Sequence, residues 1–238
     1  MSAAIRDLAL VGAGGLGRET AELVRSINAD GPTWRLVGFF DDDPALQGTS
    51  IAGLPVLGTV ADAAHGSLAI AVCTARPTVG CSRAPIAGRL DLDADRVPTL
   101  VHPSASLAPS TVIGPGSIVL AGVVATADVT IGAHVVVMPQ TVLTHDDQID
   151  DFVTIASGVR LGGGVHVERE AYLGAGAMVR EGLCIGEAAL VGMGSVVLTD
   201  VPARQTWVGV PARAVADTPP ATGSTEPVVA LPSGSVTA

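Results

Sequence analysis

The sequence predicts a chain of two parts, a small α/β unit followed by a solenoid of very short parallel strands. Three observations predict this. An aliphatic residue recurs every six positions from Val101 to Val197, without an insertion. A glycine-rich loop follows an apolar run at residues 7–11 and precedes a helical pattern. The last residues, 214–238, have no period and are rich in Pro, Ser, Thr, Ala and Gly, so we expect a disordered tail.

The period of six defines the solenoid. Sixteen of the seventeen hexad-opening residues are Ile, Leu or Val, and the exception, Ala125, is still apolar. This period suits neither an amphipathic helix nor a β-sandwich, but it fits one hexad per flat side and three sides per coil. The aliphatic side chains then point into the bore, and residues eighteen apart stack about 4.8 Å from one another.

The first part alternates strands and helices, as a small parallel sheet with crossover helices does. The expected strands are residues 7–11, 35–40 and 67–74, with a linking strand at 96–100. The expected helices are residues 18–28 and 83–90. Together they predict a Rossmann-like domain over residues 1–97, with the solenoid over 98–213.

The loop between the first strand and the first helix carries G-x-G-x-x-G at Gly12, Gly14 and Gly17. Such glycines let the backbone approach a pyrophosphate, which then lies at the helix N-terminus. Asp41 ends the second strand, where an acid that binds a ribose would lie. A dinucleotide dehydrogenase is one interpretation, although three strands are few for it and no hydride-acceptor domain follows. In a second interpretation the glycines only form the turn, and in a third they bind the pyrophosphate of a nucleotide sugar.

Composition excludes several classes of function. The net charge of -10 argues against nucleic acid and anionic membranes as partners. No uncharged apolar run of membrane-spanning length occurs, and Asp7 interrupts the N-terminal apolar stretch, so we expect neither a transmembrane helix nor a signal peptide. The three cysteines, Cys73, Cys81 and Cys184, are odd in number and scattered, which indicates reduced thiols and a cytoplasmic location.

The hexads resemble the hexapeptide-repeat acyltransferases, whose fold is a left-handed parallel β-helix. The whole pattern is similar to the sialic-acid O-acetyltransferase and bacillosamine-pathway acetyltransferase family. Its hallmarks here are VGAGGLGRE at 11–19, FFDDDP at 39–44, GLPVLGT at 53–59 and VGVPAR at 208–213. The resemblance implies a homotrimer that uses acetyl-CoA, without a metal, to acetylate a nucleotide-linked amino sugar or a sialic acid.

His145 is the predicted general base. It lies in Thr144-His145-Asp146-Asp147, where acidic residues crowd one corner of a coil, and an adjacent carboxylate can orient an imidazole and raise its basicity. The family carries His followed by Glu or Asp at this place, so the resemblance assigns the pair His145 and Asp146. Asp147 is also in reach as the orienting acid.

The stacking rule places Gly163 directly over His145, because the two residues are eighteen apart. A glycine there leaves room for a ligand and exposes a backbone N–H, and the family places a donor to the acetyl carbonyl at this point. Thr154 stands where some family members carry a second histidine. The remaining residues expected at acetyl-CoA are Ala175, Gly176, Arg180, Gly192 and Arg213.

The nucleotide sugar is expected on the glycine loop. Where this chain has Leu16, the family's loop commonly carries a histidine. The full set expected at this ligand is Gly12, Gly14, Gly15, Leu16, Gly17, Asp41 and Asp42.

The leading hypothesis is therefore an N-acetyltransferase for the 4-amino group of a nucleotide-linked sugar. O-acetylation of a sialic acid or a similar hydroxyl is the alternative, because both acceptors need the same base. A metalloenzyme of the carbonic-anhydrase kind lacks its spaced histidine pair here, and a sugar nucleotidyltransferase would need a larger first domain. A nucleotide-binding scaffold without activity remains a further alternative.

Overall fold

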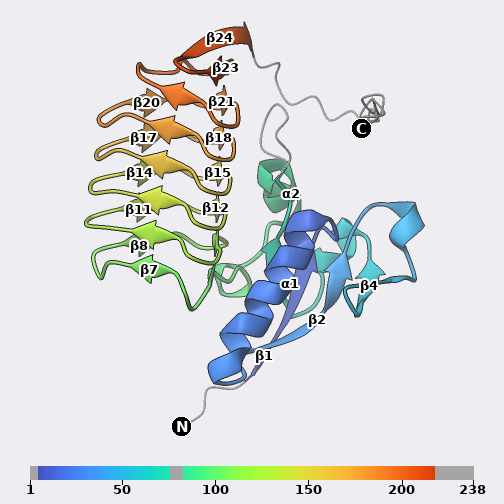
Figure 1. The fold of residues 1–238 in the computed structure, drawn as a ribbon. Coiled ribbons are helices and arrows are strands. Elements are labelled where there is room, and N and C mark those ends of the chain that lie inside the picture. Colours follow the sequence, from blue (N-terminus) through green and yellow to red (C-terminus); the bar gives the residue numbers. More distant parts are fainter. Residues whose placement is uncertain (1–4, 76–82, 218–238) are drawn as a thin grey trace, which may run out of the picture.

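The computed structural model describes residues 5–75 and 83–217, and it confirms the predicted fold class. An N-terminal α/β unit packs against one side of a triangular β-helix (Figure 1). The N-terminal sheet has the order β3-β4-β2-β1-β5 and is parallel except for the β3–β4 pair. Its strands are β1 (Arg6–Val11), β2 (Trp34–Phe40), β3 (Ser50–Ile51), β4 (Leu54–Gly58) and β5 (Ala69–Val72).

Two α-helices flank this sheet, α1 (Gly15–Ile27) and α2 (Arg83–Leu90). The prediction of α2 is confirmed at both ends, whereas α1 begins three residues before the predicted Arg18 because the end of the glycine loop is already helical. Short 3₁₀ turns lie at Asn28–Asp30, Pro44–Leu46, Val60–Ala64 and Ala94–Arg96.

The expected linking strand at 96–100 is wrong. Residue Arg96 ends a 3₁₀ turn, and its guanidinium donates hydrogen bonds to the carbonyls of Ala63, Ala64 and Leu68. These contacts hold the segment as a turn, and the chain becomes extended only at Leu100. Strands β3 and β4 were not predicted, because two short runs around Gly53 carry little periodicity.

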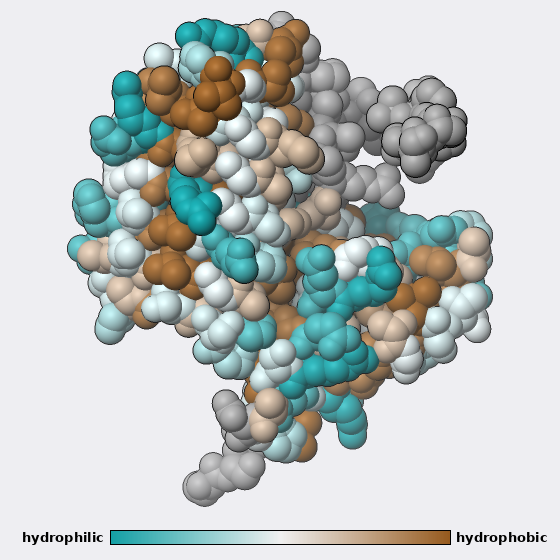
Figure 2. Space-filling view, viewed as in Figure 1, coloured by the Kyte–Doolittle hydropathy of each residue, from teal (hydrophilic) through white to brown (hydrophobic). Residues whose placement is uncertain are grey.

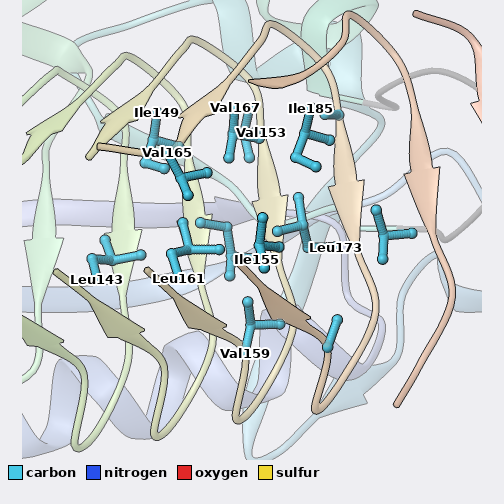
Figure 3. Close-up of a cluster of buried hydrophobic side chains, with 14 of the residues drawn as sticks. Leu143, Ile149, Val153, Ile155, Val159, Leu161, Val165, Val167, Leu173 and Ile185 are labelled. Carbon is cyan, nitrogen blue, oxygen red and sulfur yellow. The ribbon is translucent and has the colours of Figure 1, made fainter. Parts of the chain in front are cut away.

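Seventeen strands of two residues each, β6 to β22, form the β-helix, and every hexad-opening residue is the second residue of one of them. Among themselves these strands pair only with strands eighteen residues away and always in parallel, which confirms the predicted stacking. Figure 3 shows the aliphatic side chains of successive coils converging in the bore. A second inward-facing column follows four positions later, as at Val153, Val159 and Val165, which are completely buried.

The three sides of the β-helix are three sheets, named here by a central strand. The β15 sheet contains β6 (Leu100–Val101), β9 (Ile118–Val119), β12 (Val136–Val137), β15 (Thr154–Ile155), β18 (Tyr172–Leu173) and β21 (Leu190–Val191). The β13 sheet contains β7 (Ser106–Leu107), β10 (Val124–Ala125), β13 (Val142–Leu143), β16 (Arg160–Leu161), β19 (Met178–Val179) and β22 (Val196–Val197). The β14 sheet contains β8 (Val112–Ile113), β11 (Thr130–Ile131), β14 (Gln148–Ile149), β17 (His166–Val167) and β20 (Cys184–Ile185).

The N-terminal unit covers the β15 sheet over its first coils, from β6 to about β15 (Figure 1). Outward-facing Ile118 and Val136 join Leu23 of α1 in one buried cluster. Arg83, at the start of α2, is 1% exposed and donates to the carbonyls of His134, Phe152 and Val153 on the β-helix. The two parts of the chain therefore share a core and a buried polar contact.

Strands β23 (Gln205–Gly209) and β24 (Ala212–Asp217) close the far end of the β-helix as an antiparallel pair. Strand β24 runs four residues into the segment expected as a tail from 214, because its backbone pairs with β23. The rest of that expected tail, 218–238, lies outside the described residues. Within the described part of the chain, no helix has both the length and the apolar character needed to cross a membrane.

Candidate active site

His145 lies at the corner between the β13 and β14 sheets, which we call the His145 edge. Its side chain is 68% exposed, and its Nδ1 is 2.8 Å from Asp146 Oδ2. A carboxylate only accepts, so Nδ1 carries the proton and Nε2 is left with a free lone pair. Asp146 has a φ of +63°, a conformation that aspartate tolerates better than most residues and that turns its carboxylate back toward the ring. The pair has the geometry of an oriented general base.

Asp147 has a structural role, which resolves the choice between the two acids. It is completely buried and accepts hydrogen bonds from the backbone N–H groups of Thr144, at 2.7 Å, and Val165, at 2.9 Å. Burial raises the pKa of its carboxyl to about 6, although both hydrogen bonds act in the opposite direction. Asp147 thus joins two successive coils beneath the histidine, and Asp146 is the acid that contacts the imidazole.

Gly163 lies against the imidazole, as the stacking rule predicts. A Cβ at this position would be 2.3 Å from both Cε1 and Nε2 of His145, so only glycine leaves room for the ring. The flanking amides of Gly162 and Gly164 donate to Val179 and to the His145 carbonyl. Among the described residues no group accepts from the Gly163 N–H, so a donor is free beside Nε2.

The other residues expected at acetyl-CoA lie on two different edges. Arg180 is on the His145 edge, in the coil after Gly163, and its side chain is exposed. Ala175, Gly176 and Gly192 lie at the corner between the β15 and β13 sheets, which we call the Gly176 edge. Exposed Arg213 lies on β24, beyond that edge. The width of the β13 sheet separates the two edges, so one chain does not bring the whole set together.

The prediction that Thr154 contacts acetyl-CoA does not agree with its position in the structure. It lies on the β15 sheet, is 4% exposed, and its hydroxyl accepts from Arg83 Nη2 at 2.8 Å. The N-terminal unit covers this face, so the Thr154 side chain serves the contact between the two units rather than a bound cofactor.

The glycines of the N-terminal loop divide into two pairs. Gly12 has a φ of +99°, and a Cβ on Gly17 would be 2.0 Å from the Gly12 carbonyl oxygen, so these two are required by the turn itself. Gly14 and Gly15 are exposed, and a Cβ on either would meet nothing within 4 Å. The turn does not explain this second pair. They lie at the N-terminus of α1, whose first N–H groups have no acceptor within the helix.

Three expected contacts to the nucleotide sugar have other partners in the structure. The Asp41 carboxylate accepts from the Ala13 N–H at 2.8 Å and so fixes the glycine loop. The Asp42 carboxylate accepts from the Val60 N–H and from Arg89. Leu16 packs in the core beneath α1 with 9% exposure, so its side chain faces away from any ligand on the loop.

Sequence reasoning missed the outer face of the β13 sheet. Val124, Val142, Met178 and Val196 point outward there, and Met178 is 47% exposed. The signal was available, because the residue one position before the hexad opener recurs eighteen apart on this face, and four of its six members are apolar, the other two being Ser106 and Arg160. Exposed apolar side chains also gather at the end of the β-helix that carries β23 and β24 (Figure 2).

Known proteins similar to this chain are acetyltransferases, and one family model matches its N-terminal part. The family model described as the PglD N-terminal domain matches residues 7–75. The acetyltransferase domain of PglB from Neisseria gonorrhoeae is 32% identical, with a TM-score of 0.76, over 88% of this chain and 100% of that one. PerB from Caulobacter crescentus, solved with CoA and GDP-perosamine, is 29% identical with a TM-score of 0.76, over 91% of this chain and 100% of that chain.

Curated relatives match this chain over a shorter length. The GDP-perosamine N-acetyltransferase of Escherichia coli is 37% identical over 82 residues, which are 32% of this chain and 37% of that protein. A serine acetyltransferase of Bacillus pumilus is 40% identical over 76 residues, 29% of this chain and 35% of that protein. The matched segment spans about a third of the length of these curated relatives.

Proposed function

This chain belongs to the hexapeptide-repeat acetyltransferase family that includes the PglB acetyltransferase domain, and from that premise we propose that it acetylates a nucleotide-linked amino sugar. The acetyl donor is acetyl-CoA, and the acceptor is the 4-amino group of the sugar. The observation that carries the proposal is the exposed His145–Asp146 pair, with the unoccupied Gly163 N–H beside the imidazole. The relatives with CoA, acetyl-CoA or GDP-perosamine bound support the choice of ligands.

The proposed reaction is a direct transfer. The neutral amine attacks the thioester carbonyl carbon, and the Gly163 N–H donates to the oxygen as negative charge develops there. His145 Nε2 takes the proton from the attacking nitrogen, while Asp146 stabilises the imidazolium through Nδ1. The C–S bond then breaks, and the departing thiolate receives a proton, which leaves the acetamide and free CoA. Oxygen acceptors would follow the same steps, but the N-acetyltransferases among the relatives favour the amine.

We further propose that the active enzyme is a homotrimer whose β13 sheets face the threefold axis. That face carries the unpartnered Val142, Met178 and Val196. Around such an axis, the His145 edge of one copy borders the Gly176 edge of the next. Gly163 and Arg180 would then face the small residues Ala175, Gly176, Gly192 and Gly194 of a neighbour across one groove, which is where CoA would lie.

In the same trimer, a neighbouring subunit would contribute the binding site for the acceptor, the nucleotide sugar. Within one chain the N-terminal unit covers the β15 sheet, the only side that does not border the His145 edge (Figure 1). In the trimer, the neighbour's N-terminal unit lies next to His145 instead. The exposed Gly14 and Gly15 at the start of α1 would hold the pyrophosphate and direct the sugar to the base.

We also propose a cytoplasmic location for the protein. The free thiols of Cys73 and Cys184 support it, because a reducing compartment keeps thiols free.

The test is a thiol-release assay with acetyl-CoA and a panel of UDP-, GDP- and dTDP-linked 4-amino sugars. We expect release with one nucleotide series and a loss of about 100-fold or more in His145→Ala. The exposed His65 lies outside the site, and His65→Ala is the matched control that keeps full activity. Release with a sialic acid alone would replace the amine by a hydroxyl acceptor. Full activity in His145→Ala would remove this residue from the mechanism.

A further inference from the structure

A second cluster of potential ligands lies on the outer face of the β14 sheet, apart from the His145 pair. His166 of β17 and Cys184 of β20 are eighteen residues apart and directly paired, so their side chains point outward from adjacent coils. Glu168 follows His166 by two residues, and its Oε1 is 3.6 Å from the Cys184 sulfur. One nitrogen, one sulfur and one oxygen ligand atom therefore lie within 4.8 Å of one another, on three half-buried side chains.

Further acidic groups surround these three residues. Asp150 Oδ1 lies 3.1 Å from His166 Nε2, and the Asp200 carboxylate accepts from the Cys184 backbone N–H. Within the described part of the chain, no arginine forms an ion pair with Asp150, Glu168 or Asp200, and the nearby Arg169 pairs with Asp151 and Glu170 instead. The cluster thus concentrates negative charge without a side-chain cation to balance it.

The chemistry of these ligands indicates one class of ion. Thiolate and imidazole ligands favour zinc-class transition metals, whereas calcium and magnesium prefer all-oxygen sites. Ligand atoms around a tetrahedral zinc lie about 3.5 Å apart, given bonds of about 2.0–2.3 Å. The three ligand atoms, which lie within 4.8 Å of one another, would have to come somewhat closer around the ion, and rotation of three partly exposed side chains on a fixed backbone would supply this movement.

We propose that His166, Glu168 and Cys184 bind a zinc-class divalent cation, with Asp150 holding the imidazole. Carboxylates commonly hold metal-ligating histidines in this way. The ion would join two successive coils on a face that neither the N-terminal unit nor the proposed trimer contact covers. The inference does not depend on the proposed activity, because it shares no residue with the catalytic pair.

The test uses the full chain without an affinity tag, after treatment with a chelator. Titration with Co²⁺ is expected to give one saturable site per chain, with the near-ultraviolet charge-transfer band of a Co²⁺–thiolate bond, and Zn²⁺ is expected to displace it. Cys184→Ser should abolish the band while the circular dichroism spectrum stays unchanged. Removal of the exposed, remote His65 in His65→Gln should leave the titration as in the wild type.

A second variant keeps the test decisive if Cys184→Ser does not fold. His166→Gln retains a donor for Asp150 and is expected to weaken Co²⁺ binding by about 100-fold or more, because a ligand itself is lost. The absence of a thiolate band in folded wild type would overturn the proposal. A band that persists in Cys184→Ser would do the same, as would weak, unsaturable binding that is equal in wild type and variants, since this indicates an adventitious ion only.

Discussion

At the scale of single residues, the contact between Gly163 and His145 links the shape of a coil to the position of the proposed base. We predict that Gly163→Ala lowers the rate of acetyl transfer by about 10- to 100-fold, because the new methyl group displaces the imidazole from its place beside the free amide. Stability should change by less than about 0.5 kcal/mol, since the atoms that must move are the end of an exposed side chain.

The measurement is the thiol-release assay together with urea unfolding. Gly88→Ala is the matched control, because a Cβ at Gly88 in α2 meets nothing within 4 Å, and we expect full activity there. If Gly163→Ala keeps wild-type kinetics, the imidazole does not act from the position that it has in this structure.

Asp147 gives a prediction about pH. Burial raises the pKa of its carboxyl from 3.8 to about 6, so the folded state binds a proton that the unfolded state has already released between these values. The free energy of unfolding contributed by this group is therefore highest at low pH and is lost as the pH rises through about 6. Relative to Asp147→Asn, the wild type should lose up to about 3 kcal/mol between pH 4 and 7.

Urea unfolding of both proteins across this pH range measures that difference directly. The comparison cancels the titration of the other carboxyl groups, which the two proteins share. Parallel stability curves would show that Asp147 titrates alike in the folded and unfolded states.

At the scale of elements, Arg83 connects α2 to the β-helix. Its guanidinium donates to carbonyls of three β-helix residues, to the Thr74 carbonyl and to the Thr154 hydroxyl, all in the interior. We predict that Arg83→Lys costs about 3 kcal/mol, because an ammonium cannot reach all of these acceptors and leaves some of them buried without a donor.

Urea unfolding and limited proteolysis of the N-terminal unit test this prediction. Arg89→Lys is the control from the same helix. Its exposed side chain makes one ion pair, with Asp42, and the change should cost less than about 0.5 kcal/mol. Equal effects of the two substitutions would mean that the buried contacts do not stabilise the packing of the two units.

The elements also show which features a sequence can predict. Every hexad has the same local environment, so an aliphatic residue at its first position indicates a side chain that points into the bore. The eighteen-residue register then places Gly163 over His145. The contact of Thr154 with Arg83 joins residues 71 positions apart in two different units, and neither residue type indicates the other. The roles of Asp41 and Leu16 were obscured for a similar reason, because a motif gives the order of residues but not which side chains the packing beneath the loop occupies.

At the scale of the whole molecule, the proposed trimer explains several exposed apolar residues near one end of the β-helix together. Met193 on the Gly176 edge and Leu198 on the His145 edge belong to the same level of the β-helix, with Met178 and Val196 on the sheet between them. Around a threefold axis, the two edges of neighbouring copies meet at that level, so Met193 of one copy approaches Leu198 of the next. In the proposed trimer, Met178 and Val196 would lie at the axis, and Met193 and Leu198 would lie in the grooves beside it.

We predict that Met178→Glu converts the trimer to a monomer and abolishes acetyl transfer. The substitution removes the apolar contact of Met178 at the axis and buries a carboxylate there, and the cost of taking that charge out of water exceeds what the neighbouring Arg160 can return. The monomer keeps its own His145–Asp146 pair but lacks the neighbour's Gly176 edge and N-terminal unit. Activity should therefore be lost together with the trimer. Sedimentation velocity and the thiol-release assay, run on the same samples, measure both effects.

Val112→Glu is the matched control, because Val112 is also an exposed apolar residue, 61% accessible, but lies on the β14 sheet, which faces away from the axis. It should remain trimeric and active, since the same charge is placed in solvent. A Met178→Glu protein that stays both trimeric and active would move the subunit contact to another face. A monomer that keeps full activity would instead show that one chain holds a complete site, in which case the two edges of a single β-helix must each bind their ligand without a neighbour.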